Sequence, residues 1–192
     1  MIHRRLISVF VFAVMGCAPV VPAPPADGIL LQAILPPDSL GRDLSLSQEV
    51  VGEFRDQRHA LRVEVEITST RLVMVALTHL GVPVFSLEQN GDRVHVEALG
   101  AAQLPFNPRH ILSDFQIAHW PASVLRDRFR SFGLGLADAS SDGSRKVFSE
   151  SGALLVEVTY GDAVSSAGDI VIEHFDHPYR LHIRTFATSD LD

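Results

Sequence analysis

The stretch LRVEVEITSTRLVMVAL, residues 61–77, decides the fold of this chain. In its first half, apolar residues at every second position alternate with Arg62, Glu64 and Glu66. This period of two is typical of a β-strand with one buried face and one face in water. In its second half, residues 72–77 are apolar without interruption, which predicts a strand covered on both faces. Two such strands in succession predict a mainly β domain.

Strand patterns recur over the rest of the chain. Asn90-Gly91-Asp92 separates two of them, and Asn-Gly is a strong signal for a tight hairpin turn. The sequence therefore predicts an antiparallel meander of about eight to eleven strands. Besides the two strands above, the expected strands begin near residue 45 and continue at 82–87, 93–97, 146–150, 154–160, 169–174 and 180–186.

Residues 107–132 interrupt the strands with a helical pattern. Asn107 can cap a helix and Pro108 suits its first turn, and apolar residues then follow at helical spacing. Trp120-Pro121 breaks the pattern, and Gly133 ends a second apolar stripe. Two amphipathic helices inserted into one antiparallel sheet have to lay their apolar faces on it. We therefore expect a curved sheet with a helical cover.

The amino-terminal residues are typical of an exported bacterial protein. Arg4 and Arg5 precede an apolar run over residues 6–15, which is too short to span a bilayer and predicts a signal peptide over residues 1–16. The quartet Val14-Met15-Gly16-Cys17 resembles a bacterial lipobox, in which cleavage before the cysteine is followed by its acylation. The alternative is an ordinary signal peptide beside a chance cysteine.

Lipidation of Cys17 would decide where the protein works. Two or more acyl chains hold a protein stably on a membrane, whereas one chain anchors it reversibly. Ala18 stands where an aspartate typically retains such lipoproteins at the inner membrane, so the resemblance implies a lipid anchor on the periplasmic face of the outer membrane. Residues 17–28 then form the lipidated cysteine and a proline-rich tether of about 30 Å. Residues 29–192 form one domain.

Composition limits the function classes. Removal of the signal peptide leaves 176 of the 192 residues, enough for one domain with its own core. The formal charge of −7 becomes −9 once Arg4 and Arg5 are removed, which argues against a nucleic-acid partner. Cys17 is the only cysteine, so its acylation would exclude a disulfide, a cysteine-ligated zinc ion and a cysteine nucleophile.

The nine histidines offer one candidate for chemistry. His174, Asp176 and His177 form the densest group, but their spacing matches no common zinc signature. The same residues precede Pro178-Tyr179, as in a polar hairpin turn. The sequence also has no nucleophile elbow and no phosphate-binding glycine loop. We therefore expect no enzymatic activity, metal ion or cofactor, and a hydrolase or metal enzyme is the weakest of three hypotheses.

Surplus apolar side chains favour a binding function instead. Residues 72–77 and the two helices can enclose a pocket, because ligand pockets are mostly apolar with few polar groups. The alternative is that the same residues fill a solid core. The predicted cavity and lid residues are Leu72, Met74, Ile111, Leu112, Phe115, Trp120, Leu125 and Phe129.

Three stretches carry a resemblance to a known family. Residues 35–41 (LPPDSLG), 78–81 (THLG) and 111–116 (ILSDFQ) with 118–121 (AHWP) resemble an uncharacterised family of bacterial lipoproteins. That family is a distant relative of the LolA/LolB outer-membrane lipoprotein carriers. The resemblance implies a mainly β fold with two helices, an incomplete antiparallel β-barrel with a helical lid, whose interior takes acyl chains.

The resemblance also implies a role for Leu80. In LolB, a loop between the third and fourth strands carries a leucine before a glycine and projects toward the membrane, and Leu80 precedes Gly81 here. The alternative is an ordinary turn with Leu80 pointing inward.

Two non-enzymatic hypotheses follow. The leading one is a monomeric outer-membrane lipoprotein that takes a lipid or acyl-chain ligand from a periplasmic carrier protein, as part of lipoprotein or lipid transport. The second is a structural or interaction lipoprotein of an envelope complex, without a ligand cavity.

Overall fold

The computed structural model describes residues 28–54, 57–99, 107–139, 143–161, 168–176 and 179–191. The predicted signal peptide, Cys17 and most of the tether lie outside these residues, and so does His177 of the predicted polar group.

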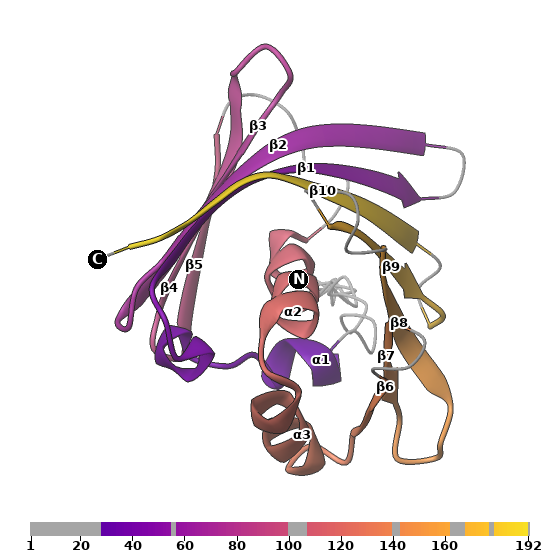
Figure 1. Cartoon of the computed structure of the whole chain (residues 1–192). Helices are drawn as coiled ribbons and strands as arrows, with labels where there is room; N and C mark the ends of the chain where they lie inside the picture. Colours follow the sequence, from indigo (N-terminus) through magenta and orange to yellow (C-terminus); the bar gives the residue numbers. More distant parts are fainter. Residues whose placement is uncertain are drawn as a thin grey trace, which may run out of the picture.

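Ten antiparallel strands form one curved sheet in the order β5-β4-β3-β2-β1-β10-β9-β8-β7-β6 (Figure 1). The chain runs outward from β1 to β5, crosses through the helices, and returns from β6 to β10, so that β10 pairs with β1. Within the described residues, β5 and β6 each have one neighbour, so the barrel is incomplete. The predicted mainly β fold is therefore confirmed. The strands are β1 (Leu44–Phe54), β2 (Gln57–Ile67), β3 (Arg71–Leu77), β4 (Pro83–Asn90), β5 (Arg93–Ala98), β6 (Gly135–Ala139), β7 (Ser144–Phe148), β8 (Leu154–Tyr160), β9 (Asp169–His174) and β10 (Tyr179–Asp190).

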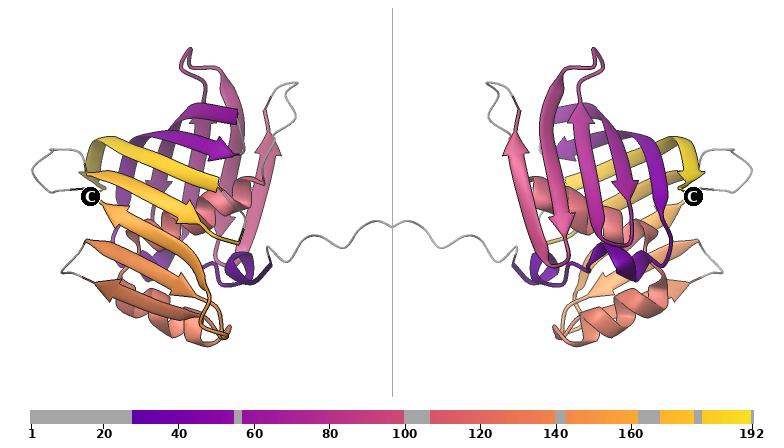
Figure 2. Two further views of the ribbon diagram at one scale, coloured as in Figure 1. Left: turned by 90° about the vertical axis from the view of Figure 1, so that its right-hand side faces the viewer. Right: turned by 90° about the vertical axis from the view of Figure 1, so that its left-hand side faces the viewer.

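The helices lie on the concave side of this sheet. Figure 2 shows α2 (Pro108–His119) inside the curve, while α3 (Ala122–Arg130) packs beside β6 at one end. The Asn107 side-chain oxygen accepts a hydrogen bond from the Arg109 backbone N–H at 3.1 Å, which confirms the predicted cap. A short helix α1 (Gly28–Gln32) and a 3-10 turn η1 (Pro37–Leu40) precede β1. Among the described residues, no helix is long and apolar enough to cross a membrane.

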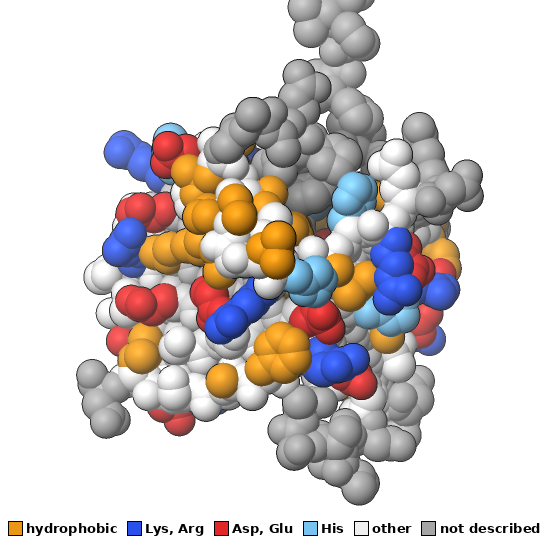
Figure 3. Space-filling view, turned by 90° about the horizontal axis from the view of Figure 1, so that it is seen from above, with side chains coloured by type: hydrophobic (Ala, Val, Ile, Leu, Met, Phe, Trp, Pro, Cys, Tyr) orange, Lys and Arg blue, Asp and Glu red, His pale blue; other side chains and the backbone are white. Residues whose placement is uncertain are grey.

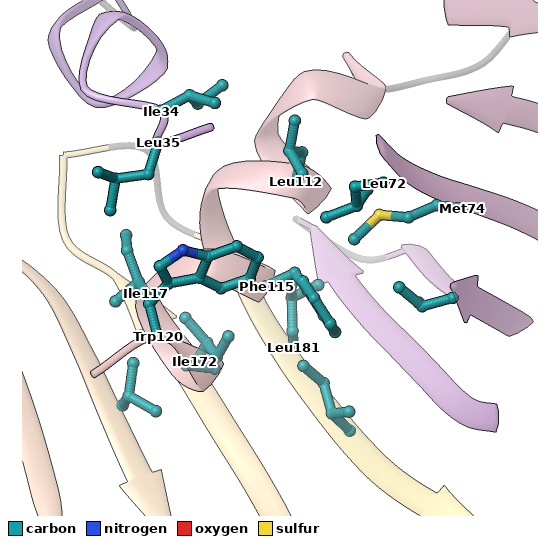
Figure 4. Close-up of a cluster of buried hydrophobic side chains, with 14 of the residues drawn as sticks. Ile34, Leu35, Leu72, Met74, Leu112, Phe115, Ile117, Trp120, Ile172 and Leu181 are labelled. Carbon is teal, nitrogen blue, oxygen red and sulfur yellow. The ribbon is translucent and has the colours of Figure 1, made fainter. Parts of the chain in front are cut away.

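The core fills the space between the sheet and α2 (Figure 4). Alternate side chains of each strand point toward the helices, as the period of two predicted. The prediction that residues 72–77 are covered on both faces was wrong. Leu72, Met74 and Ala76 are fully buried, whereas the side chains between them are only half-buried because none of the described helices covers the convex face beside them.

Two elements had no counterpart in the sequence prediction. Helix α1 has only five residues and follows the proline-rich segment, so it shows no helical period. Strand β6 begins at Gly135, two residues after Gly133, the glycine that was expected to end the helix. Both elements are too short for periodicity to reveal them. In the structure, α1 packs against α2, and β6 packs against α3.

Candidate functional site

A cavity of about 330 Å³ opens between the sheet and the amino-terminal half of α2. Its walls come from β1, β2, β9 and β10 on the sheet side and from α1 and α2 on the helix side. Val50, Leu61, Ile111 and Leu181 supply much of its apolar surface. Ile29 and Phe54, which are also in its wall, remain partly exposed to solvent. The arrangement is that of a mostly apolar pocket with a few polar groups, which suits a ligand with a hydrocarbon chain.

A buried polar cluster of three side chains forms part of the cavity wall. The His174 Nε2 atom lies 2.7 Å from the Asp114 Oδ1 atom, and the Tyr179 hydroxyl donates to the Asp114 Oδ2 atom at 2.7 Å. The His174 and Tyr179 rings stack with centroids 4.1 Å apart. Asp114 comes from α2, His174 from β9 and Tyr179 from β10, so the cluster ties the helix to the sheet beside the cavity.

The carboxylates around His174 favour its charged form. Burial by itself lowers the pKa of His174, but the Asp114 carboxylate, together with Asp176, outweighs burial and raises it to about 9. The Nδ1 atom of His174 lies 3.8 Å from the Asp176 Oδ1 atom, so a carboxylate faces each ring nitrogen. The cluster is a buried ion pair with a hydroxyl attached to it, and its polar atoms are directed at one another.

The predicted cavity residues separate into two groups. Ile111 lines the cavity. The other seven are almost fully buried and pack in the core between the sheet and the two helices: Leu72, Met74, Leu112, Phe115, Trp120, Leu125 and Phe129. Figure 4 shows Leu72 and Met74 beside Leu112, and Phe115 beside Trp120. The solid-core alternative thus describes how these seven residues lie, while the cavity is formed by Ile111 and by residues outside the predicted set.

Two of the stretches that carry the family resemblance contact each other. The Gln116 side chain accepts from the Leu35 backbone N–H at 2.8 Å and donates to the Leu35 carbonyl at 2.8 Å. The Trp120 indole N–H donates to the Ser39 hydroxyl at 2.7 Å. These three bonds join α2 and its C-cap residue Trp120 to the segment before β1. Gln116 and Ser39 are polar residues within apolar patterns, and this was the sequence signal that could have indicated the contact between the two stretches.

The third stretch forms the loop between β3 and β4. Leu80 exposes 90% of its side chain and Val82 exposes 57%, the largest values among the exposed large apolar residues described. The Thr78 side chain accepts a hydrogen bond from the Val82 backbone N–H, and Gly81 has a φ of 78° that suits glycine. Figure 3 looks down on the end of the molecule where this loop projects, and apolar side chains gather there. Leu80 therefore points outward.

Within the buried polar cluster, the residues that sequence reasoning missed are Asp114 and Tyr179. Asp114 lies among the apolar residues of the α2 sequence. A carboxylate buried at such a position needs a partner, so this residue could have indicated a buried ion pair. Its partner His174 belongs to the polar group His174, Asp176 and His177, which the sequence offers as a candidate for metal or acid–base chemistry. Within the described residues, no group of three or more His, Cys, Asp or Glu side chains is placed to hold a metal ion.

A second hollow, of about 450 Å³, lies near the carboxyl-terminal end of α2. Its wall mixes charged, polar and apolar residues, including Arg42, His119 and Thr185. The Gln48 side-chain amide lies 3.2 Å from the His119 Nε2 atom and donates to the Thr185 hydroxyl at 3.0 Å. Burial, with nearby Arg145 and Arg42, lowers the pKa of His119 to about 4. This mixed lining suits a hydrocarbon chain less well than the first cavity does.

Comparisons with known proteins give a family and two likenesses of structure. No curated protein matches the sequence. The chain is similar to a LolA superfamily protein from Nitrosomonas europaea, with 10% identity over 85% of this chain and 92% of that chain and a TM-score of 0.46. It is also similar to a domain described as an outer membrane lipoprotein-sorting protein from Vibrio parahaemolyticus, with 7% identity over 78% and 85% of the two chains and a TM-score of 0.44. The model of the family described as "Protein of unknown function (DUF3261)" matches residues 45–187, from β1 to β10, and this chain therefore belongs to that family.

Proposed function

We propose that this protein is a lipoprotein of the periplasmic face of the outer membrane that takes an acyl chain of a lipid or lipoprotein into its apolar cavity. The observation that carries the proposal is the cavity between α2 and strands β1, β2 and β10. Its volume of about 330 Å³ lies at the small end of the range of ligand pockets, which favours one chain over several. Burial of a chain there would contribute about 25 cal/mol per Å² of apolar surface.

Longer chains would need movement of α2 away from the sheet. The seven predicted residues now in the core would line the additional space, so they remain candidate contacts of an opened form. Several polar contacts between α2 and the sheet oppose such movement, among them the ion pair of Asp114 with His174 and the hydrogen bonds that the Arg145 side chain donates to the Ile117 and Trp120 carbonyls. We propose that the closed form holds a chain end and that opening α2 would admit more of the chain.

The binding proposal is tested by the lipids that accompany the protein. Mass spectrometry of the purified mature chain is expected to find a co-purifying acyl lipid, and the neutral dye Nile red is expected to fluoresce in the cavity. Ile111→Glu places a charge in the cavity wall and should reduce dye binding about tenfold or more. Val124→Glu, a matched change on α3 away from the cavity, should leave binding unchanged. Absence of both lipid and dye binding would contradict the proposal.

The membrane anchor is tested at Cys17. Cys17→Ala should release the protein from membranes, because acylation at this position is the proposed anchor. Ala18→Asp is the matched control, since it keeps the cysteine and should leave the protein membrane-bound but in the inner-membrane fraction. If Cys17→Ala still sediments with the outer membrane, the anchor lies elsewhere.

We also propose that the β3–β4 loop enters the membrane interface through Leu80. Its exposure of 90% supports this role, because an apolar side chain at a loop tip can be buried among lipid headgroups. Leu80→Ser in a non-lipidated chain should weaken binding to phospholipid vesicles by several-fold. Phe186→Ser removes another exposed apolar side chain and should have a smaller effect. Equal effects of the two changes would argue against a specific role for the loop.

A further inference from the structure

We propose that the cavity selects acyl chains whose polar end is uncharged, such as an ester or an amide, and excludes free fatty acids. This inference rests on the proposed function, since it concerns the ligand of the same cavity. It goes further because it assigns the chemistry of the polar end from the charges in the cavity wall.

The wall carries an excess of negative groups. Within the part of the chain that the structure describes, three carboxylates line the cavity: Glu53, Asp114 and Asp176. Among the described residues that line it, there is no lysine and no arginine. Glu53 forms an exposed ion pair with Arg58 at 3.8 Å, and Arg58 is not in the wall. The other titratable residues described in the wall are His59, His110, His174 and Tyr179. A ligand carboxylate in this space would therefore meet several like charges.

The one buried cation of the wall already has its counterions. His174 Nε2 lies 2.7 Å from Asp114, and His174 Nδ1 lies 3.8 Å from Asp176. The raised pKa of His174, about 9, is consistent with a cation held by carboxylates. A fatty-acid carboxylate would have to displace one of these carboxylates, and breaking a buried pair is costly. If His174 lost its proton, the wall would become more negative and the exclusion of an anion would be stronger.

Uncharged polar groups in the same wall suit an ester or amide. Gln57 and Asn107, which carry side-chain amides, are both among the residues that line the cavity. Asn107 uses its oxygen atom to cap α2, and a primary amide also carries two N–H donors. An ester carbonyl needs one such donor and introduces no charge. The wall is therefore able to hydrogen-bond a neutral chain end without changing its own ion pairs.

The test compares two ligands that differ only in charge. The mature chain from Ala18 is produced behind a signal peptide that lacks a lipobox, and dodecanoate and methyl dodecanoate are used to displace Nile red at about pH 8. At this pH the fatty acid is ionised and an ordinary histidine is neutral. The ester is expected to bind about tenfold more tightly than the carboxylate, a difference of about 1.4 kcal/mol. Equal affinity, or tighter binding of dodecanoate, would overturn the inference and leave the proposed function standing. Failure of both ligands and the dye to bind would overturn the proposed function itself.

Two variants locate the effect in the wall. Asp176→Asn and Glu53→Gln each remove one negative charge with little change of shape, and each should narrow the ester-to-acid ratio by several-fold. Asp127→Asn, which changes an exposed carboxylate on α3, is the matched control and should leave the ratio unchanged. Two wall variants are used so that poor folding of one leaves the other as a test. If neither variant narrows the ratio and both fold, the wall carboxylates do not set the selectivity.

Discussion

The two ends of helix α2 differ in how they are packed. Toward the carboxyl terminus, Trp120 is almost fully buried, meets Phe115 edge-on with ring centroids 6.0 Å apart, and donates to Ser39. Toward the amino terminus, Ile111 and Asp114 face the cavity. The same helix thus packs in the core through Phe115 and Trp120 and borders the apolar cavity through Ile111 and Asp114.

The histidines near these two ends have pKa values that are shifted in opposite directions. His174, beside the cavity, has a carboxylate opposite each ring nitrogen and a pKa raised to about 9. His119, at the other end, lies near a neutral amide and two arginines, and its pKa is lowered to about 4. Burial lowers the pKa of both rings, so the charge of the neighbours decides which one carries a proton.

The largest expected loss of stability comes from removing Trp120, the buried aromatic side chain at the carboxyl-terminal end of α2. Trp120→Ala should lower the free energy of unfolding by about 3 to 5 kcal/mol, because it leaves a large void in the core. Ile111→Ala should cost only about 1 kcal/mol, because this side chain already borders open space. Urea denaturation of both variants measures the difference. Similar losses would mean that the two ends of α2 are packed alike.

The buried ion pair should give the next largest effect. Asp114→Asn leaves His174 without its nearest carboxylate and should cost about 3 kcal/mol at neutral pH. Asp127→Asn breaks an exposed pair with Arg130 and should cost less than about 1 kcal/mol. Urea denaturation near pH 7 checks both values. If Asp114→Asn is as mild as its control, the pair contributes little to holding α2 on the sheet.

The sequence was sufficient for the parts of the fold that repeat a local pattern. Periodicity placed β8 at residues 154–160 and β9 at residues 169–174, and Asn107 marked the start of α2. The cavity could not be found in this way. The apolar residues that follow a clear helical or strand period pack in the core. The cavity is lined in part by residues at strand ends that follow no apolar period, such as Gly52 and Glu53. Such residues look like surface in the sequence, because only the curvature of the sheet turns them toward α2.

The ion pair was also beyond local reasoning. Asp114 and His174 are 60 residues apart in the chain, and no spacing rule joins a helix position to a strand position at that separation. Sequence could show only that a carboxylate stood in an apolar stripe. The topology, which returns β9 to the side of β10 next to α2, brings the two groups together.

Alkaline pH should weaken the cavity end. The pKa of His174 is higher in the folded state than the ordinary value of 6.5, so its contribution to stability is complete below about pH 6.5 and is lost as pH rises through about 9. We expect a loss of about 2 kcal/mol across this interval relative to His174→Gln, which cannot titrate. Urea denaturation of both proteins between about pH 6 and pH 9 provides the comparison. Parallel profiles would show that His174 is not held as a cation.

Mild acid should weaken the other end, by a smaller amount. The pKa of His119 is lower in the folded state than the ordinary value, so its contribution is complete above about pH 6.5 and is lost as pH falls through about 4. Because the ring is only partly shielded from solvent, we expect about 1 kcal/mol relative to His119→Gln. Measuring the difference between the two proteins cancels the titration of carboxylates that both share. A wild-type profile that falls toward acid no faster than that of His119→Gln would contradict the assignment, and the contrast between the two histidines would then rest on His174 alone.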